Sequence, residues 1–384
     1  TAPSCSGAMC GRGAYTMAPG RCSRIAGGAR VRDAKRLRPR YNLGPQSFVP
    51  VVRRLASGAG QTKGQQDGLE VVAMRWGLVP SFAKRREEYD GWGAPSTFNA
   101  RVEGLESSGM WRRLLGSHRG VVLFDGFYEW KTVGKTKVPM FIRHPDNYLG
   151  HCISQPKAVG STSAPGGVDS SSCDSSGPVL PVEPTQSQAQ DASDPQTQAD
   201  HTFPEGPRHA PLMMAALYDI WKPGKEAEGE ALESASILTM DSSGTPVFKV
   251  HDRMPVFLTP DTAAAWLDTS VGFSEVLPAV MKASVELAGQ LHIYEVPPLV
   301  SNMRNDTPEC LLPKKEYDSR QLSKGIGRFF AKKAEAPAVA PVAAPAEPAS
   351  QQKRPAQEAA GGHPAKVARA PDIAKAEVIS LDED

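Results

Sequence analysis

The sequence predicts a mixed α+β domain with a curved, largely antiparallel, barrel-like sheet and a few helices. Segments rich in β-branched and aromatic residues recur along the chain and are bounded by turn residues, as β-strands are. Two segments late in the chain have the composition and capping residues of helices. One long polar segment interrupts the series of strands. This set of elements is typical of an α+β fold with one core.

The first strands are predicted before that polar segment. Residues 69–80, LEVVAMRWGLVP, mix β-branched and aromatic residues and run into a turn. Residues 120–130, GVVLFDGFYEW, are predicted to be an apolar strand that ends in a turn carrying polar groups. Residues 138–144, VPMFIRH, follow after KTVGKTK and are the predicted hairpin partner.

The strand pattern resumes after the polar segment. Further strands are predicted at residues 211–221, 234–241, 254–259 and 291–300. A helix is predicted at 260–268, where Asp261 or Thr262 is the expected cap before AAAWL. A second helix is predicted within 273–290.

Two stretches have a composition that cannot build a core. Residues 154–210 are mainly Ser, Gln, Pro, Asp and Thr, and the end of the chain is rich in Ala and Pro. We expect both to be disordered, because they bury too little apolar surface to offset the entropy of ordering them. The predicted organisation is an extension at 1–8, one domain at 9–313 that contains the insertion, and a tail at 314–384.

The net charge of +2 hides an uneven distribution of charged residues. Residues 21–54 hold ten basic residues against one acid, Asp33. Such a run favours an anionic partner, nucleic acid first, and the alternative is a solvated, flexible arm. Charge alone leaves both interpretations open.

The cysteine pattern argues against a metal site. The six cysteines include no C-x-x-C pair and are few for 384 residues, so we expect neither a zinc site nor a disulfide framework. No metal and no cofactor are predicted. No apolar run approaches the ~18 residues of a membrane span, and the N-terminus has no signal-peptide core. A monomer satisfies every feature of the sequence.

Four polar residues have apolar neighbours: Asn99 and Arg101 in TFNARVE, Glu129 in FYEW, and His251 in VFKVHDRMPVF. Each also has a structural interpretation, such as a turn cap for Asn99, a surface ion pair for Glu129 and a satisfied core position for His251. With Cys10 they supply an amide, a carboxylate, an imidazole and a thiol, the groups that a carbonyl-attacking site needs. Their order matches no cysteine-protease signature.

Seven blocks of sequence carry a resemblance to a known family. They are MCGR, YNLGP, MRWGLVPSF, FNARVE, DGFYEW, HDRMP and SNMRNDTPECL, in this order. With them the chain resembles the SRAP family, the SOS-response-associated peptidase proteins, which are abasic-site-processing sensors that form DNA–protein crosslinks. The resemblance covers residues 9–153 and 211–313 and implies a single SRAP domain.

The resemblance implies an enzyme that senses abasic sites in single-stranded DNA. The α-amine of Cys10 would attack the aldehyde at the deoxyribose C1′ to give a Schiff base, and the thiol would then close a thiazolidine intramolecularly. Asn99 would position the aminothiol and the sugar, and Glu129 would manage protons at the amine. His251 would act as general acid and base in ring opening and crosslink reversal. A lyase side activity and self-cleavage ahead of Cys10 are also implied.

Five residues are carried over from the family as contacts to the DNA. Arg12 and Arg101 match positions that hold phosphates next to the lesion. Asn42 and Pro45, in YNLGP, would line the path of the strand. Trp130 would stack against or wall the lesion.

Phe82 stands where the family often has tryptophan, after the PS of VPSF. The resemblance implies a wedge against duplex DNA, which survives the change because stacking needs only a flat ring. Some members carry an arginine near the position of Gly109, whereas the nearest bases here are Arg112 and Arg113. A late motif has either a structural role or a DNA role; its residues are Asn302, Arg304 and Asn305.

The N-terminus departs most from the family. Eight residues, TAPSCSGA, precede Met9, and while they remain Cys10 has no free amine. Three explanations are open: a true start at Met9 with an artefact upstream, self-processing before Cys10, or a copy unable to crosslink. The first is favoured, because Met directly before Cys is what a start codon leaves.

The segment SKGIGRFFAKK in the tail resembles a PCNA-interacting box at 323–330. Its anchors would be Ile326, Phe329 and Phe330, with Ser323 in place of the usual glutamine. The alternative is an amphipathic helix packed on the domain.

The last residues, EVISLDED, resemble a SUMO-interacting motif at 378–384. Val378, Ile379 and Leu381 would add a strand to the edge of a partner sheet, and the acidic end would meet basic residues. Together the two motifs imply PCNA and SUMO or SUMOylated proteins as partners and a nuclear location at replication forks.

Two other classes of function compete with the crosslinking enzyme. One is a non-covalent adaptor that binds single-stranded DNA and delivers the tail motifs. The other is a cysteine peptidase that acts on other proteins. The joint presence of Cys10, Asn99, Glu129 and His251 argues against the adaptor, and the lack of an oxyanion signature weakens the peptidase.

Overall fold

The computed structural model describes most of the predicted domain. The residues that it describes are 11–55, 68–90, 96–146, 152–153, 209–224 and 230–323. Cys10, almost all of the predicted insertion, and both tail motifs beyond Ser323 lie outside the described residues.

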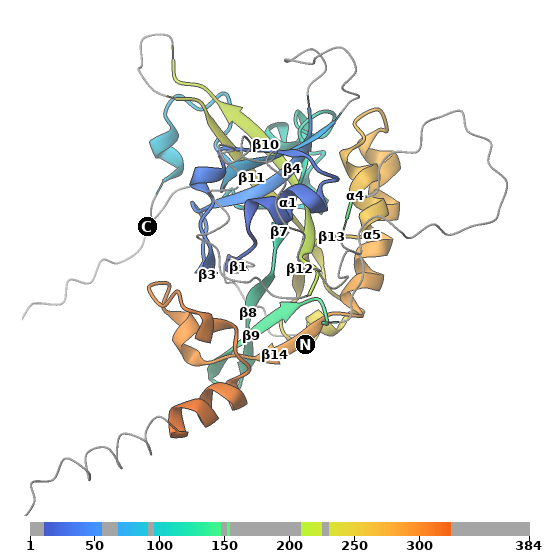
Figure 1. Ribbon diagram of the computed structural model, residues 1–384. Coiled ribbons are helices and arrows are strands. Elements are labelled where there is room, and N and C mark those ends of the chain that lie inside the picture. The colour runs from blue at the N-terminus through green and yellow to red at the C-terminus, as the bar shows by residue number, and fades with distance from the viewer. Residues whose placement is uncertain are drawn as a thin grey trace, which may run out of the picture. The chain divides into compact units, whose positions relative to one another are not determined.

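Five strands of the larger sheet close into a barrel (Figure 1). Strand β4 pairs antiparallel with β5 and β7, β7 pairs with β10, and β10 pairs with β11. Strand β11 then pairs in parallel with β5, where Ser234 lies opposite Arg75, and this pairing completes the ring. Within the described residues this sheet consists of β2 (Arg30–Arg32), β4 (Phe48–Arg54), β5 (Leu69–Trp76), β6 (Asn99–Arg101), β7 (Arg119–Phe124), β10 (Leu212–Trp221), β11 (Leu232–Asp241), β12 (Arg253–Pro255) and β13 (Phe257–Leu258).

A second, smaller sheet continues from the barrel. Its strands, in spatial order, are β14 (His292–Glu295), β9 (Thr136–Arg143), β8 (Gly126–Val133), β1 (Gly13–Tyr15) and β3 (Arg40–Leu43), and neighbours in it are antiparallel. The chain passes from β7 of the barrel into β8 of this sheet through Asp125. A Cβ atom on Gly126 would collide with the ring of Phe141 and the carbonyl of Ile142. Glycine is therefore required where the chain changes sheets.

The helices lie outside the sheets. They are α1 (Pro19–Ile25), α2 (Gly109–Arg112), α4 (Pro260–Leu267) and α5 (Phe273–Ala288), and residues 314–323 are also helical. Helices α4 and α5 lie side by side along one flank of the barrel (Figure 1). The buried indole of Trp266 on α4 donates to the carbonyl of Gly120 on β7, at 2.9 Å. The 3₁₀ helices are η1 (Ala34–Arg36), η2 (Arg86–Tyr89), η3 (Val102–Gly104), η4 (Pro246–Lys249), η5 (Pro298–Ser301) and η6 (Pro308–Leu311).

The predicted fold class is confirmed, and several boundaries differ. The predicted strand at 120–130 is two strands divided at Asp125, and 254–259 is divided at Val256. The short strands β1, β2, β3 and β6 and the longer β4 were not predicted. The four short strands have three or four residues each, too few to show a period, and form because neighbouring strands supply their hydrogen bonds.

The cap of α4 also differs from the prediction. Thr259 is the N-cap, and its hydroxyl accepts from the backbone N–H of Thr262 while the Thr262 hydroxyl accepts from the Thr259 N–H. Pro260 fits the first helical position because it has no N–H to leave unsatisfied. Neither Asp261 nor Thr262 is the cap, whereas the predicted start of the helix at residue 260 is confirmed.

Most of the basic run at 21–54 stabilises the domain. Arg32 and Arg53 both pair with the buried carboxylate of Glu70 and with Glu233 on β11. Four more bases are held by carboxylates or backbone carbonyls: Arg21, Arg36, Arg40 and Arg54. The flexible-arm interpretation is wrong, because this run forms strands and ion pairs. The exposed bases left for an anionic partner are Arg24, Arg30, Lys35 and Arg38.

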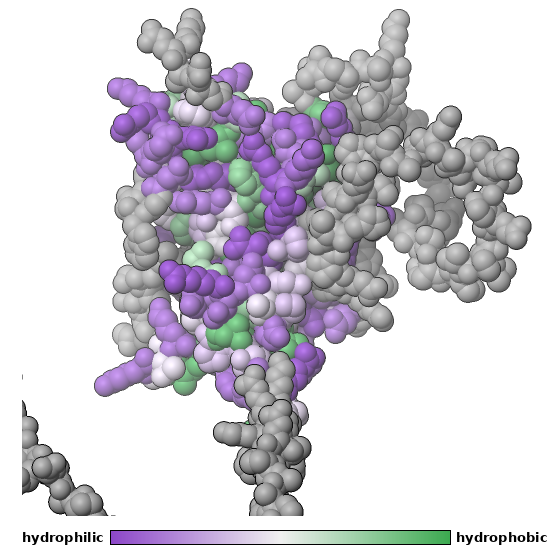
Figure 2. All heavy atoms as spheres, turned by 60° about the vertical axis from the view of Figure 1, so that its left-hand side comes forward, coloured by the Kyte–Doolittle hydropathy of each residue, from purple (hydrophilic) through white to green (hydrophobic). Residues whose placement is uncertain are grey.

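The described surface is mostly polar. On the face in Figure 2, hydrophilic residues cover most of the coloured surface and apolar residues form small separate patches. Within the described residues, no helix is both long and apolar enough to cross a membrane.

Asp125 at the joint between the sheets gives a prediction about stability and pH. It is buried and accepts from the N–H and the hydroxyl of Thr16, at 2.6 and 2.7 Å. Burial raises the pKa of its carboxyl to about 6, against the opposing effect of these hydrogen bonds. The folded chain therefore keeps a proton that the unfolded chain releases near pH ~4, and the free energy of unfolding falls as the pH rises from ~4 to ~6.

Asp125→Asn removes this titration. The difference in melting temperature between the variant and the wild type should shift in the variant's favour between pH ~4 and ~6, by the equivalent of up to about 3 kcal/mol. Melting curves of both proteins at pH 4 to 7 measure it. Parallel profiles would show that Asp125 is ionised in the folded protein throughout that range.

Candidate functional site

The start of β1 lies beside Glu129. Strand β1 pairs with β8, with Gly13 opposite Phe127, and the backbone N–H of Tyr128 donates to the carbonyl of Arg12 at 2.9 Å. Continuing this antiparallel register places Gly11 opposite Glu129. The Glu129 side chain is almost fully buried, with 4% of its surface exposed. The residue that carries this buried carboxylate therefore lies opposite Gly11, the residue that follows Cys10 in the chain.

Arg12 is held by neutral groups. One guanidinium nitrogen, Nη1, donates to the side-chain oxygen of Asn42 at 2.8 Å and to the carbonyl of Val300 at 2.9 Å. The guanidinium carbon lies 5.4 Å from the centre of the Trp130 ring. Burial lowers the pKa of Arg12, with small opposing effects of Tyr128 and Cys310. Its hydrogen-bond partners here carry no charge, so the cation is positioned to receive an anion.

Asn42 is fully buried and binds the segment that follows η5. Its amide nitrogen donates to the carbonyls of Val300, Asn302 and Asn305, at 3.0, 3.1 and 2.8 Å. The buried side chain of Asn42 therefore positions Arg12 and residues 300–305. That Asn42 also lines the path of a DNA strand stays a prediction.

The late motif packs against β1, β3 and β8. Asn305 donates from its side chain to the carbonyl of Leu299, at 2.8 Å. Asp306 accepts from the backbone N–H groups of Tyr41 and Asn42, at 2.6 and 2.9 Å. Cys310 is buried in an apolar cluster that also contains Ala14 of β1, Tyr128 of β8 and Val300. These contacts favour the structural role over the DNA role for this motif.

Pro45 and Trp130 lie near this motif. Pro45 is half-buried next to Gly44, and a Cβ atom on Gly44 would collide with the methyl group of Met303. Trp130 is half-buried, and its indole N–H donates to the Ser301 hydroxyl at 3.2 Å. The guanidinium of Arg12 lies over the Trp130 ring, so the ring and the cation form one surface.

Asn99 and Arg101 lie on the same side of β6. This strand pairs in parallel with β11, so that Asn99 is opposite Ile237 and Arg101 is opposite Thr239. Ala100, between them, is buried on the other side. Asn99 is half-buried and Arg101 is exposed. The turn-cap interpretation of Asn99 is wrong, because the residue is part of a strand.

Arg253 is a residue that the sequence analysis missed. It forms a two-point ion pair with Glu103, with nitrogen–oxygen distances of 2.6 and 2.9 Å. It also donates to the carbonyl of Thr239, the residue opposite Arg101. The pair joins two of the quoted blocks, since Glu103 ends FNARVE and Arg253 lies in HDRMP. Arg253 thus places a second cation close to Arg101.

His251 follows η4 and is anchored through its backbone. Its carbonyl accepts from the Ser242 hydroxyl at 2.6 Å. The imidazole Nδ1 lies 2.8 Å from the Asp252 carboxylate and 3.2 Å from the backbone N–H of Arg253. Neutral imidazole accepts from that N–H, whereas protonated imidazole donates to the carboxylate. Both forms have a partner, which suits proton transfer better than an inert core position.

The structure thus groups the predicted residues in two places. Arg12, Glu129 and Trp130 lie on the smaller sheet, around the start of β1. Asn99 and Arg101 lie along β11 of the barrel, and the loop that carries His251 leads into β12 beside the same strand. Phe82 is apart from these groups on an exposed loop, with 61% of its surface accessible.

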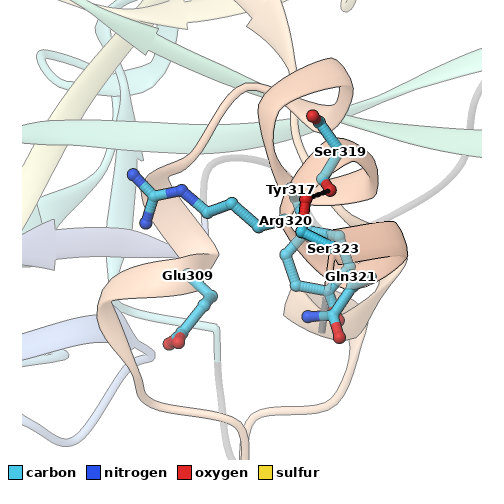
Figure 3. Close-up of a pocket in the computed structure, with 6 residues that line it drawn as sticks. All are labelled: Glu309, Tyr317, Ser319, Arg320, Gln321 and Ser323. Carbon is cyan, nitrogen blue, oxygen red and sulfur yellow. Dashed lines mark hydrogen bonds between the residues drawn. The ribbon is translucent and has the colours of Figure 1, made fainter. Parts of the chain in front are cut away.

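A pocket lies away from all of these residues. It is formed between η6 and the helical residues 314–323, and Figure 3 shows its lining: Glu309, Tyr317, Ser319, Arg320, Gln321 and Ser323. None of the six is a cysteine or a histidine, so the lining offers no nucleophile–imidazole pair. Within the described residues, no cluster of three or more His, Cys, Asp or Glu side chains is arranged to hold a metal ion.

Asn42 gives a prediction about stability. Asn42→Ala removes the two N–H donors shared among three carbonyls and the acceptor for Arg12, so the free energy of unfolding should fall by about 3 kcal/mol, at ~1 kcal/mol for each of the three hydrogen bonds. Urea denaturation measures the loss. Asn302→Ala is the matched control, because Asn302 is exposed and its side chain accepts only from the Arg304 N–H. Similar losses in the two variants would contradict the role given to Asn42.

Comparison of this chain with known proteins gives one family model and several relatives that share one description. The model of the family described as SOS response associated peptidase (SRAP) matches residues 9–303. An abasic site processing protein, HMCES, of Gallus gallus is 31% identical, with 79% of this chain and 78% of the relative aligned. HMCES of Xenopus tropicalis is also 31% identical over the same shares. The abasic site processing protein YoqW of Bacillus subtilis is 24% identical, over 71% of this chain and 85% of its own.

Proposed function

This chain belongs to the SRAP family, and on that basis we propose that it detects abasic sites in single-stranded DNA and crosslinks to them through Cys10. Support comes from relatives named abasic site processing proteins and from the arrangement of the site. The observation that carries the proposal is the register of β1 and β8, which brings the start of β1 to the buried carboxylate of Glu129.

The chemistry requires Cys10 to be the first residue of the mature chain. Its α-amine adds to the aldehyde carbon C1′ of the opened sugar, and loss of one water gives an imine. The thiol then adds to the imine carbon, and its proton goes to nitrogen, which completes a thiazolidine ring. Because both nucleophiles belong to one residue, the second addition is intramolecular and gains a large effective concentration.

Glu129 is assigned the proton transfers at the amine. An α-ammonium group is not a nucleophile, and a carboxylate beside it accepts the proton that must leave before attack. Asn99 is assigned to hold the sugar and the aminothiol. His251 is assigned the proton transfers of sugar-ring opening and of crosslink reversal, because its imidazole has a partner in either protonation state.

The cations are assigned to the phosphates that flank the lesion. Arg12 is bound only by neutral acceptors, and Arg101 is exposed. Arg253 lies beside Arg101 and adds to the positive field, although Glu103 offsets part of its charge. Phe82 is assigned as the wedge against the duplex, where the single strand begins.

Self-cleavage before Cys10, or a start at Met9 followed by hydrolytic removal of that methionine, supplies the free amine. This explains how a family described as peptidases includes proteins that process DNA. An imine that does not close its ring also permits strand cleavage by β-elimination, which is the proposed lyase side activity.

The tail motifs extend the proposal to partners. Ile326, Phe329 and Phe330 would bind PCNA, and residues 378–384 would bind SUMO or SUMOylated proteins, in the nucleus at replication forks. These segments lie outside the described residues. A non-covalent adaptor that recruits the same partners is the second candidate function, favoured if the residues ahead of Cys10 are retained.

Substitution of Cys10, in a chain that begins at that residue, tests the mechanism. Wild-type protein should form an adduct with an abasic single strand that survives heating in denaturant. Cys10→Ser should lose the heat-stable adduct but still be trapped by borohydride, because it keeps the amine that forms the imine. Denaturing gels with labelled DNA measure both.

A chain that retains residues 1–8 is the matched control and should give neither adduct, because its Cys10 nitrogen is an amide. A heat-stable adduct with Cys10→Ser, or with the extended chain, would overturn the proposed chemistry.

Glu129→Gln tests the proton transfer. At pH 7 the crosslinking rate should fall by roughly 10²- to 10⁴-fold, the usual contribution of a general base. The deficit should shrink above pH ~8, where an α-amine loses its proton without help. Single-turnover rates from pH 6 to 9 measure the effect, with Glu286→Gln, an exposed glutamate on α5, as control. A deficit that does not change with pH would remove Glu129 from this role.

A further inference from the structure

Phe82 is held in an exposed position by the residues on either side of it. The backbone N–H of Ser81 donates to the Asp219 carboxylate at 2.6 Å, and the carbonyl of Ala83 accepts from the Trp221 indole at 2.9 Å. The N–H of Val79 donates to the Ser234 hydroxyl at 2.8 Å. The backbone around Phe82 is therefore fixed, while 61% of the residue remains exposed. Hydrogen bonds from the barrel thus hold this loop in a conformation that exposes the Phe82 ring to solvent.

Strand β10 supplies both of the contacts next to Phe82. Asp219 and Trp221 are two residues apart, so their side chains leave the same face of the strand. Asp219 is 2% exposed and Trp221 is 7% exposed. A buried carboxylate and a buried indole of the barrel thus set the position of the loop.

Arg113 connects Asp219 to the ring of Phe82. It follows α2 and pairs with the Asp219 carboxylate, and it also donates to the Ser81 hydroxyl at 3.1 Å. Its guanidinium carbon lies 5.1 Å from the centre of the Phe82 ring. Asp219 therefore orients both the backbone of Ser81, just before Phe82, and the guanidinium of Arg113, which stacks on the Phe82 ring. With Arg113 over its ring, Phe82 still has 61% of its surface accessible to a ligand.

The surroundings of this unit suit a nucleic acid. Lys84, Arg85 and Arg86 follow Phe82, and Arg112 precedes Arg113, all of them exposed. Arg85 pairs with Glu88, and Arg86 pairs with Glu87. A flat apolar ring among exposed cations is the combination that binds stacked bases and phosphates.

We propose that Asp219 and Arg113 are positioning residues that form, with Phe82, one stacking platform for the terminal base pair of a duplex beside the single strand. The proposal rests on the proposed function and adds to it. Because Arg113 is neutralised by Asp219, its contribution is the flat guanidinium that supports the ring, and phosphate binding falls to the exposed Lys84 and Arg112.

Affinity for a non-reactive abasic analogue tests the proposal. The probes are two oligonucleotides that carry a tetrahydrofuran residue, one single-stranded and one with a duplex that ends beside that residue. Fluorescence anisotropy gives the ratio of the two affinities. Phe82→Ala should lower the ratio by roughly 5- to 100-fold, the effect of one lost base–aromatic stack, and Phe82→Trp should restore it.

The positioning residues have a distinct expected result. Arg113→Ala and Arg113→Lys should both lower the ratio, since an ammonium group lacks the flat surface of guanidinium. The double variant Arg113→Ala with Asp219→Asn should lower the affinity ratio by no more than Arg113→Ala or Asp219→Asn alone, because the two residues act together. The dependence of affinity on salt should stay unchanged in Arg113→Ala and weaken in Arg112→Ala, which removes an exposed cation.

An unchanged ratio in Phe82→Ala and Arg113→Ala would overturn this proposal, as would a weakened salt dependence in Arg113→Ala. Arg113→Ala leaves the buried Asp219 carboxylate without its cation, whereas Phe82→Ala changes an exposed side chain, so the Phe82 test holds even where the variants of Arg113 and Asp219 fail to fold. The proposed function fails separately, when wild-type protein forms no adduct with a reactive abasic site.

Discussion

The buried amide of Asn42 is the interaction on which the geometry of the site depends. Its nitrogen binds three carbonyls of residues 300–305 and its oxygen accepts from Arg12. Residues far apart in the sequence are thereby fixed around the first described strand. Unsatisfied carbonyls in a buried position are costly, so this arrangement has little freedom to change. Through Arg12, Asn42 and Val300 hold the chain just ahead of β1.

The second constraint is the joint between the two sheets. Strands β7 and β8 are separated by Asp125 alone, and the close approach at Gly126 allows no side chain there. One continuous stretch of chain therefore ties the barrel, which carries Asn99 and Arg101, to the sheet that carries Glu129. This short connection joins the two sheets from which the residues assigned to one reaction come.

The sequence was sufficient for the fold class and for the main strands, because long apolar runs such as those at 69–76 and 212–221 are unambiguous. It could not show that β11 closes a barrel by pairing with β5, since a parallel contact between distant strands leaves no local pattern. Nor could it show that Asn42 is buried or that Arg253 pairs with Glu103. The sequence motifs select the candidate site residues, whereas the burial and the hydrogen-bond partners of each residue show its structural role.

The central claim is that the N-terminal aminothiol of Cys10 is the group that reacts. Mass spectrometry of the digested adduct, made with protein purified from its own cells, tests it most directly. We predict a peptide that begins at Cys10 and carries the sugar remnant with the loss of one water. An adduct on any other residue, or a Cys10 peptide still joined to residues 1–9 in crosslinked material, would contradict the account.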